Sequence, residues 1–484
     1  MPRFKDYNQN QGVFRQLVPN ELLEEDHPAR IIDAVVERLN LERIYASYKD
    51  EGKPAYHPKM MLKVLFYSYQ TGALSCRKME AGLQMRADFV YLSGDQVPDF
   101  RTLNMFRTRH MEELPGLFAQ IVTLCASLGM VSFKHLAIDG QKIAADANFR
   151  NTMNRTRAKK RLEKISRGMK KLLEEDPDED VSRASLEKRA RDLERKKVRL
   201  EQTLAILETL EDEKASINMV DAEAKIMSHK DRRILPSYNQ QSAVDGAYGI
   251  TCAVATRQSG DAPEDLFGLV DEARQNTGGS FAAVLADSGF CDYERLRAIE
   301  EEREESFYVP DKRHDVELNG SVVRGEYDKS KFVLGPECRR MICPHGQEMK
   351  LLSEKSYKDG HVERLFEGTS CEDCPVRGAC TKAKKGRRRV SYDSRQVFRT
   401  LMRERLTEPA GREAYRRRQG IVEPVHGHDQ KNLGWRQHHL RGLKKAGLEF
   451  LLVRLAGNIG KIARYKAREL LSLAGGQVTL SVGI

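Results

Sequence analysis

The segment Phe281 to Ala286 (FAAVLA) is apolar at every position, and Asp287 follows it directly. A short run of this kind is typical of a strand that is covered on both faces. We therefore expect an α/β fold, in which ligands gather outside the carboxyl ends of the strands. Asp287 stands at such an end, which makes it a candidate site residue. The alternative is that Asp287 caps a helix starting near Tyr293, although five residues separate the two positions.

A second candidate acid, Asp139, lies inside a segment with strand character. Phe133 to Ile143 (FKHLAIDGQKI) alternates Leu136 and Ile138 just before Asp139 and Gly140. The pattern predicts a strand with a carboxylate in its middle, although Asp-Gly is also a common hairpin turn.

The nearest rival to Asp139 is Asp146. It lies in the polar sequence AADANFRN, without an apolar strand around it.

A third candidate acid, Glu423, lies in a strongly basic stretch from Arg416 to Leu443 (RRRQGIVEPVHGHDQKNLGWRQHHLRGL). One interpretation is an ion pair with a neighbouring arginine. The other is a metal ligand on a surface that holds phosphates, because Mg²⁺ is bound by carboxylates together with substrate phosphates. Pro424 implies that a helix either starts near Val422 or bends there.

Three segments together resemble the DDE transposases of bacterial insertion sequences. They are HLAIDGQKI around Asp139, AVLADSGF around Asp287 and IVEPVHGHDQKNLGWRQHHLRGL around Glu423, in the order of that family. The resemblance runs from about residue 12 to about residue 460. It implies an RNase H-like mixed-sheet catalytic core on which Asp139, Asp287 and Glu423 bind two Mg²⁺ or Mn²⁺ ions.

The chain departs from the family pattern near the third acid. The family usually has a lysine seven residues after the Glu and an aromatic residue three after it, where this chain has Gln430 and His426. Lys431 is one place further along.

The activity implied by the resemblance is metal-dependent cleavage at the ends of an insertion sequence, followed by strand transfer into target DNA. Two metal ions about 4 Å apart would serve the attacking and the leaving oxygen. Two alternatives remain open: a catalytically silent DNA-binding protein derived from a transposase, and a metal-dependent nuclease of the same fold.

Charge is concentrated in the C-terminal region. The 484-residue chain has a net charge of +11, and residues 382–469 hold 24 Lys and Arg against 8 Asp and Glu. This excess favours double-stranded DNA as the partner, both terminal repeats and target, with assembly as a homo-oligomer on that DNA. The candidate DNA contacts are Lys384, Lys385, Arg387, Arg388, Arg389, Arg416, Arg417, Arg418, Lys431, Trp435, Arg436 and Arg441.

Trp435, the single tryptophan, has two interpretations. It could stack on an extruded base of the DNA end, or pack on the catalytic core. The sequence has no apolar run of about 18 residues and no signal-like start, so we expect a cytoplasmic protein, associated with the nucleoid when it acts, with reduced cysteines.

The first 130 residues are predicted to be helical, with helices at 28–39, 57–69, 75–85 and 98–111. The last of these carries Arg101, Arg107 and Arg109, which we expect to be exposed. The pattern alone is equally typical of a plain helical bundle, whereas the family resemblance favours a helix-turn-helix-like DNA reader.

We expect an N-terminal DNA-binding domain at 1–130, a catalytic domain at 131–470 and a tail at 471–484. A charged helical hairpin at 152–215 and a Cys-rich insertion at 320–390 interrupt the catalytic domain. Leucines recur every seven residues in the hairpin, which indicates either packing on itself or a dimerising coiled coil. A β-hairpin is predicted near residues 238–256.

The Cys-rich insertion predicts a structural zinc site. Cys371 and Cys374 have the two-residue gap of a zinc knuckle, and Cys343 and Cys380 complete a set of four thiolates. The alternative is an insertion with reduced cysteines and no metal.

Overall fold

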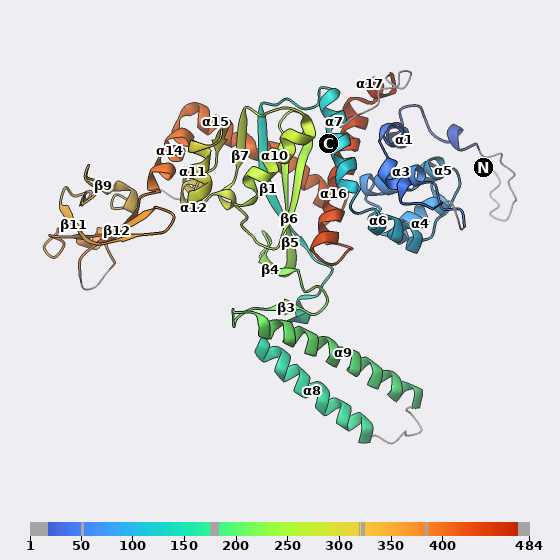
Figure 1. Ribbon diagram of the computed structural model, residues 1–484, viewed down its shortest axis with the longest axis horizontal. Helices are drawn as coiled ribbons and strands as arrows, with labels where there is room; N and C mark the ends of the chain where they lie inside the picture. The colour runs from blue at the N-terminus through green and yellow to red at the C-terminus, as the bar shows by residue number, and fades with distance from the viewer. Residues whose placement is uncertain are drawn as a thin grey trace, which may run out of the picture.

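The computed structural model describes residues 18–49, 53–174, 183–318, 320, 325–382 and 386–472. The molecule is elongated, with the N-terminal helices at one end, a central sheet beside them and a second sheet at the far end (Figure 1). A long two-helix hairpin projects to the side of the central sheet (Figure 1). No helix in the described residues is long and apolar enough to cross a membrane.

The N-terminal part consists of short helices, and the four predicted ones occur. Ser75 caps its helix by accepting the N–H of Lys78 at 3.3 Å. Arg107 is buried rather than exposed, because it donates to the hydroxyl of Tyr69 at 2.8 Å, whereas Arg101 and Arg109 are exposed. The elements are η1 (Pro19–Glu21), α1 (Pro28–Arg38), α2 (Glu42–Ala46), α3 (Pro58–Gln70), α4 (Cys76–Met85), α5 (Ala87–Ser93), α6 (Phe100–Arg109) and α7 (Leu114–Ser127).

One C-terminal helix, α16 (Leu443–Tyr465), joins these helices to the central sheet. It contacts α3 and α7 on one side and strand β6 (Thr251–Arg257) on the other. Its apolar side chains, among them Phe450 and Leu452, are fully buried. The N-terminal helices and the sheet therefore share one hydrophobic core, and α17 (Ala467–Ser472) follows on the outside of α1.

The central sheet is mixed, with strands in the order β4-β5-β1-β7-β8. Strand β6 also pairs with β5. β1 pairs in parallel with β7 and antiparallel with β5. β7 also pairs in parallel with β8, and β5 and β6 form the predicted hairpin. The mixed α/β class expected from the sequence is confirmed. The elements are β1 (His135–Ala144), β4 (Lys225–Ser228), β5 (Ile234–Asp245), β7 (Ala283–Ala286), β8 (Ser306–Tyr308), α10 (Asp265–Thr277), η3 (Ser288–Phe290), α11 (Tyr293–Glu301) and α12 (Lys312–Leu318).

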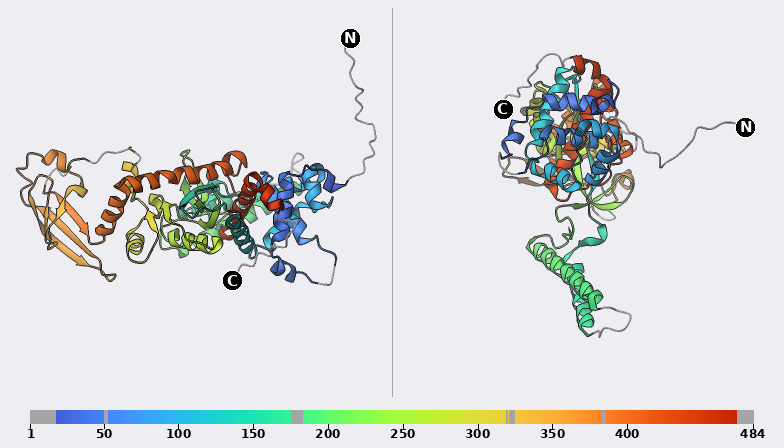
Figure 2. Two further views of the ribbon diagram at one scale, coloured as in Figure 1. Left: turned by 90° about the horizontal axis from the view of Figure 1, so that it is seen from above. Right: turned by 90° about the vertical axis from the view of Figure 1, so that its right-hand side faces the viewer.

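The hairpin between β1 and β4 is built from α8 (Arg155–Glu174) and α9 (Arg183–Thr209). Apolar side chains of the two helices form a small core of their own. The short strands β2 (Thr152–Met153) and β3 (Ile217–Asn218) pair at its base, next to η2 (Phe149–Asn151). In side view the hairpin stands clear of the remaining chain (Figure 2).

The second sheet, which we call the arm sheet, has five antiparallel strands in the order β13-β12-β11-β10-β9. Two helices, α14 and the long α15, lead from it back to the central sheet (Figure 1). The elements are η4 (Lys329–Lys331), β9 (Val333–Leu334), β10 (Arg340–Ile342), β11 (Glu348–Ser356), β12 (Val362–Gly368), α13 (Arg377–Cys380), β13 (Arg389–Asp393), α14 (Gln396–Thr407), α15 (Pro409–Gly427) and the π-helix η5 (His428–Asn432).

Candidate active site

Two of the three predicted acids lie side by side on neighbouring strands. The parallel register of β1 and β7 places Ile138 opposite Ala286, and Asp139 and Asp287 are the next residues on each strand. Each carboxylate accepts a backbone N–H through Oδ1, Asp139 from Gly140 at 2.8 Å and Asp287 from Gly289 at 2.9 Å. The packing of the sheet thus brings together two acids that are far apart in the sequence.

The turn alternative for Asp139 does not hold. Asp139 pairs with Ser242 and Gly140 with Gln241, so that the strand continues through the Asp-Gly step. Glycine is needed here for a close approach, because a Cβ on Gly140 would lie 2.6 Å from Oδ1 of Asn239.

The alternative that Asp287 caps the helix starting near Tyr293 is also wrong. Asp292 caps α11 by accepting the N–H of Arg295 at 2.7 Å. Asp287 instead caps only the single turn η3 that follows β7.

Burial makes both acids hard to ionise, and the charge of Asp139 adds to this effect at Asp287. Burial raises the pKa of Asp139, although the nearby Arg418 counters this effect. Burial, followed by the charge of Asp139, raises the pKa of Asp287 to about 6. Two buried carboxylates that repel each other form a site that favours cations.

Arg418 of α15 brings a positive charge into the site, and Lys230 also lowers the pKa of Asp139. Its Nη1 lies 3.2 Å from Oδ2 of Asp139, and the two side chains are only 11% and 15% exposed. Burial would lower the pKa of Arg418, but Asp139, Tyr415 and Asp287 together raise it. A DNA contact was predicted at Arg418, whereas this side chain turns inward onto Asp139.

His426, one of the departures from the family pattern, also faces the site. Its Nδ1 lies 4.0 Å from Oδ2 of Asp139, and its Nε2 lies 3.3 Å from Oγ of Ser242. Burial, together with the charge of Arg454, lowers the pKa of His426 well below its ordinary value. The imidazole is therefore neutral near pH 7 and adds no positive charge.

Glu423 lies on the exposed side of α15. Among the described residues it has no ion pair or hydrogen bond through its side chain, so the ion-pair interpretation has no partner here. It precedes His426 by three residues, which is about 60° around a helix and about 4.5 Å along it. It also lies five residues after Arg418, which is about 140° around a helix from the side chain that pairs with Asp139. The position of Glu423 beside the two acids therefore stays a prediction.

Pro424 does not mark a helix start. α15 runs from Pro409 through Pro424 to Gly427, and a π-helical turn follows at His428–Asn432. Such turns occur mostly as local insertions in α-helices and are frequent at functional sites.

A buried network fixes the end of α15 against β1. Asp429 lies 2.8 Å from Nη2 of Arg454 and accepts a hydrogen bond from Gln141 of β1 at 2.7 Å. Gln430, where the family usually has lysine, donates to the same Gln141 at 3.2 Å. The network holds the segment that carries Glu423 and His426, and the sequence analysis did not single out Asp429 or Arg454.

Asp315 of α12 is a further acid that the sequence analysis missed. It accepts hydrogen bonds from the hydroxyls of Tyr415 at 2.8 Å and Ser288 at 3.2 Å. Its charge also contributes to the raised pKa of Asp287. The related sequence signal is Tyr415, three residues before Arg418 on the same side of α15, because its hydroxyl is the donor to Asp315.

Comparison with known families gives two matches. The family model described as "Transposase DDE domain" matches residues 342–463, and the one described as "Transposase domain (DUF772)" matches residues 18–109. The resemblance to DDE transposases of insertion sequences is confirmed. No curated protein matches the chain. The DDE match includes Glu423 but begins at residue 342, after both Asp139 and Asp287, so the grouping of those two acids rests on their geometry.

The transposase families imply a DNA substrate, and several predicted contacts are exposed. Arg416, Lys431 and Arg436 are exposed. Arg417 and Arg441 are exposed too, but Arg417 pairs with Glu413 at 3.3 Å and Arg441 pairs with Asp146 at 2.9 Å.

Three other predicted contacts are engaged within the arm sheet. Arg387 pairs with Glu372, Arg389 pairs with Glu367, and the guanidinium of Arg388 lies over the ring of Phe332. Lys384 and Lys385 lie outside the described residues.

Trp435 is part of the core. It is 0% exposed, and its ring stacks on Phe450 at a centroid distance of 5.8 Å and meets His438 edge-on. The structure therefore corrects the base-stacking expectation, because α16 covers the indole completely. The packing alternative describes this residue.

The four predicted zinc ligands converge in the arm sheet. Cys343, Cys371, Cys374 and Cys380 line one small cavity of about 30 Å³. Burial raises the pKa of the Cys380 thiol, and the other three thiols raise it further. Gly368 leaves the space for Cys371, because a Cβ there would lie 2.3 Å from its Sγ. No three of these sulfurs lie within 4.8 Å of one another in the described residues.

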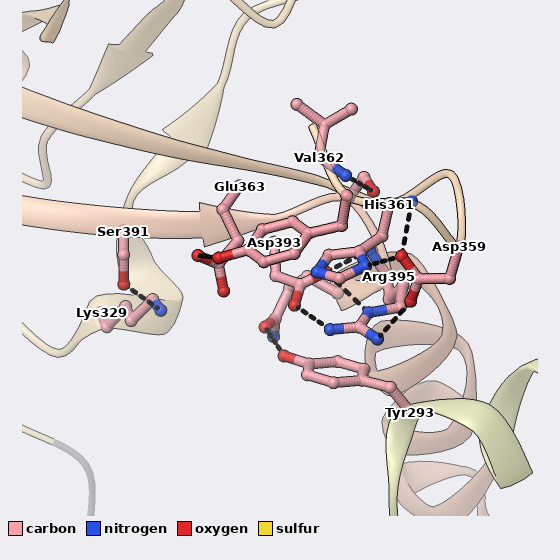
Figure 3. A network of polar contacts seen from close by, with 12 residues as sticks. Tyr293, Lys329, Asp359, His361, Val362, Glu363, Ser391, Asp393 and Arg395 are labelled. Carbon is pink, nitrogen blue, oxygen red and sulfur yellow. Dashed lines mark hydrogen bonds and ion pairs between the residues drawn. The ribbon is translucent and has the colours of Figure 1, made fainter. Parts of the chain in front are cut away.

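One trio in the described part of the chain does meet that distance, and it lies in the arm sheet rather than at the strand ends of the central sheet. It consists of His361, Glu363 and Asp393 (Figure 3). Both oxygens of Asp393 already accept hydrogen bonds from Arg395, whose guanidinium also lies over the ring of Tyr293 from α11. This network connects the arm sheet to the central domain, and both oxygens of Asp393 are engaged in it.

Proposed function

We propose that the chain is a transposase that cuts the ends of an insertion sequence and joins them to target DNA. The observation that carries the proposal is the pair of partly buried acids on adjacent parallel strands. Asp139 and Asp287 have raised pKa values and lie beside a helix within the matched DDE domain. Charged groups held at such cost are typical of functional sites.

The order of strands supports an RNase H-like core. β6, β5 and β1 are antiparallel, and β7 and β8 continue from β1 in parallel. Ligand sites of open sheets lie at the carboxyl ends of the strands, and Asp287 directly follows the last residue of β7.

The residues fit divalent cations of the Mg²⁺ or Mn²⁺ type. Asp139 and Asp287 provide hard oxygen donors, and Glu423 on α15 is the proposed third. Two cations bound there would stabilise the attacking and the leaving oxygen of a phosphodiester. The same acids in their protonated form would not bind cations, so binding requires that Asp287 lose its proton.

Arg418 and His426 set the charge balance of the site. In the free protein Arg418 neutralises part of the charge of Asp139. If cations were bound by the two acids, the guanidinium of Arg418 would be available for a phosphate oxygen, with which Arg forms strong charge-assisted hydrogen bonds. His426 remains neutral and can accept or donate one hydrogen bond without repelling a cation.

Exposed cations around the site extend this surface to the DNA backbone. Arg416, Arg417, Lys431 and Arg436 are exposed and would contact phosphates of a terminal repeat, and assembly of two or more copies on DNA completes the proposal. The N-terminal helices, matched by a transposase domain, are the proposed reader of the repeat.

A strand-transfer assay tests the proposal. Duplex DNA copied from the two flanks of the gene is incubated with the protein, Mg²⁺ and a supercoiled plasmid. We expect cleavage at one defined position and covalent insertion into the plasmid. Cleavage without any joined product would instead identify a nuclease, and the absence of both would contradict the proposal.

A further inference from the structure

The hairpin of α8 and α9 carries a charged surface that has no role in the proposed cleavage and strand transfer. α8 packs on α9 through an apolar face that includes Ala158, Leu162, Ile165 and Met169. Between residues 155 and 172 the rest of α8 carries nine Lys and Arg and a single acid, Glu163. The helix is therefore apolar on one side and strongly basic on the other.

Four of these cations form a stripe, which we call the α8 basic stripe: Lys160, Lys164, Arg167 and Lys171. Their spacing of four, three and four residues places them along one side of a helix. All four are exposed, and none has an ion pair or a hydrogen bond through its side chain with any residue that the structure describes. Like charges at this spacing repel one another, so the stripe is a cost to the isolated helix.

α9 provides an internal comparison. Between residues 184 and 209 it carries seven Lys and Arg, but five acids are interleaved with them. Arg195 pairs with Asp192 and Lys197 with Glu201 within the same helix. The positive charge of the hairpin is thus concentrated on α8.

The dimensions of the stripe fit a nucleic-acid backbone. Eleven residues of helix span about 16 Å, which is about the axial rise of five phosphates on one strand at 3.4 Å each. In the view of Figure 1, α9 lies on the side of the N-terminal helices and α8 on the side away from them. Since the stripe is opposite the contact with α9, it faces open space.

We propose that the α8 basic stripe binds the phosphate backbone of duplex DNA outside the candidate active site. The choice of duplex DNA rests on the proposed function, and the charge of the stripe is complementary to it. The contact is independent of base sequence, because lysines and arginines on phosphates position a duplex without reading it. The hairpin then lengthens the DNA footprint beyond the central sheet.

The test compares two full-length variants with matched loss of charge. One is Lys160→Gln, Lys164→Gln, Arg167→Gln and Lys171→Gln on α8. The other is Lys188→Gln, Arg191→Gln, Arg195→Gln and Arg199→Gln on α9. Fluorescence anisotropy measures binding to a labelled duplex of arbitrary sequence over a range of KCl concentrations, and circular dichroism checks that both variants keep their helix content.

For the α8 variant, the slope of log Kobs against log[KCl] should become shallower by about 3.6, since each phosphate contact contributes about 0.9. The α9 variant should change the slope by less than about 1, because one contact at most is lost. Equal slopes for the wild type and the α8 variant, or equal losses in both variants, would overturn the inference.

The outcome is separable from that of the proposed function. Loss of slope in a protein that shows no strand transfer would leave the α8 contact in place and reject the transposase activity. Strand transfer with an unchanged slope would support the transposase activity and reject the α8 contact.

Discussion

Replacement of Asp287 by asparagine tests whether the two buried acids strain the folded protein. The pKa of Asp287 is about 6, against an ordinary value of 3.8. Since one pKa unit corresponds to about 1.36 kcal/mol, the ionised carboxylate costs the fold about 3 kcal/mol at pH 8. The folded chain binds this proton more tightly than the unfolded chain does. The stabilisation by the proton is therefore fully present below about pH 4 and is lost as the pH rises through about 6.

Asp287→Asn removes the charge and retains an oxygen that can accept the N–H of Gly289. In urea unfolding without divalent cations, the variant should be more stable than the wild type at pH 8. This gap should shrink by about 1–2 kcal/mol at pH 5, where the wild-type carboxyl is largely protonated. Glu304→Gln, at an exposed carboxylate, is the control and should match the wild type at both pH values. If the variant and the wild type differed in free energy of unfolding by the same amount at pH 5 and pH 8, the pKa of Asp287 would not be raised in the folded protein.

Three further predictions concern the site and its supports. Arg418→Gln should destabilise the cation-free protein by about 3–5 kcal/mol at pH 8, because Asp139 loses a buried partner, and Mg²⁺ should restore part of the loss in thermal unfolding; an unchanged melting temperature would argue against the pair. Trp435→Ala should cost about 3–5 kcal/mol of stability through a core cavity, and a folded variant that loses only DNA cleavage would return the indole to the DNA. Purified protein should contain about one zinc per chain, lost in the Cys371→Ser and Cys374→Ser double variant; metal analysis that finds well below half occupancy after chelator-free purification would exclude the site.

The positions of Asp139 and Asp287 were accessible from the sequence because their signals are local. An apolar run followed by an acid, and an alternating run with an acid in its middle, each predict a strand without reference to the rest of the chain. The parallel pairing that places the acids side by side follows from the fold and needed the family resemblance to be anticipated.

The roles of Arg418 and Trp435 could not be derived in the same way. Three consecutive arginines, residues 416–418, point in three directions from a helix, and only the packing of α15 on β1 and β7 decides which one turns inward. Trp435 has basic neighbours, which suggested the surface, but it lies outside regular helix and its ring points toward α16. Both outcomes are set by tertiary contacts rather than by residue type.

The most direct test of the central claim is Mg²⁺-dependent nicking of a terminal-repeat duplex by Asp139→Asn, Asp287→Asn and Glu423→Gln. Each substitution keeps the size of the side chain and removes the charge that a metal ion requires. The account predicts that all three variants still bind the duplex and that nicking falls by orders of magnitude in each. Near wild-type nicking by Glu423→Gln would show that this residue is not a metal ligand. Near wild-type nicking by Asp139→Asn or Asp287→Asn would show that these acids do not form the catalytic site.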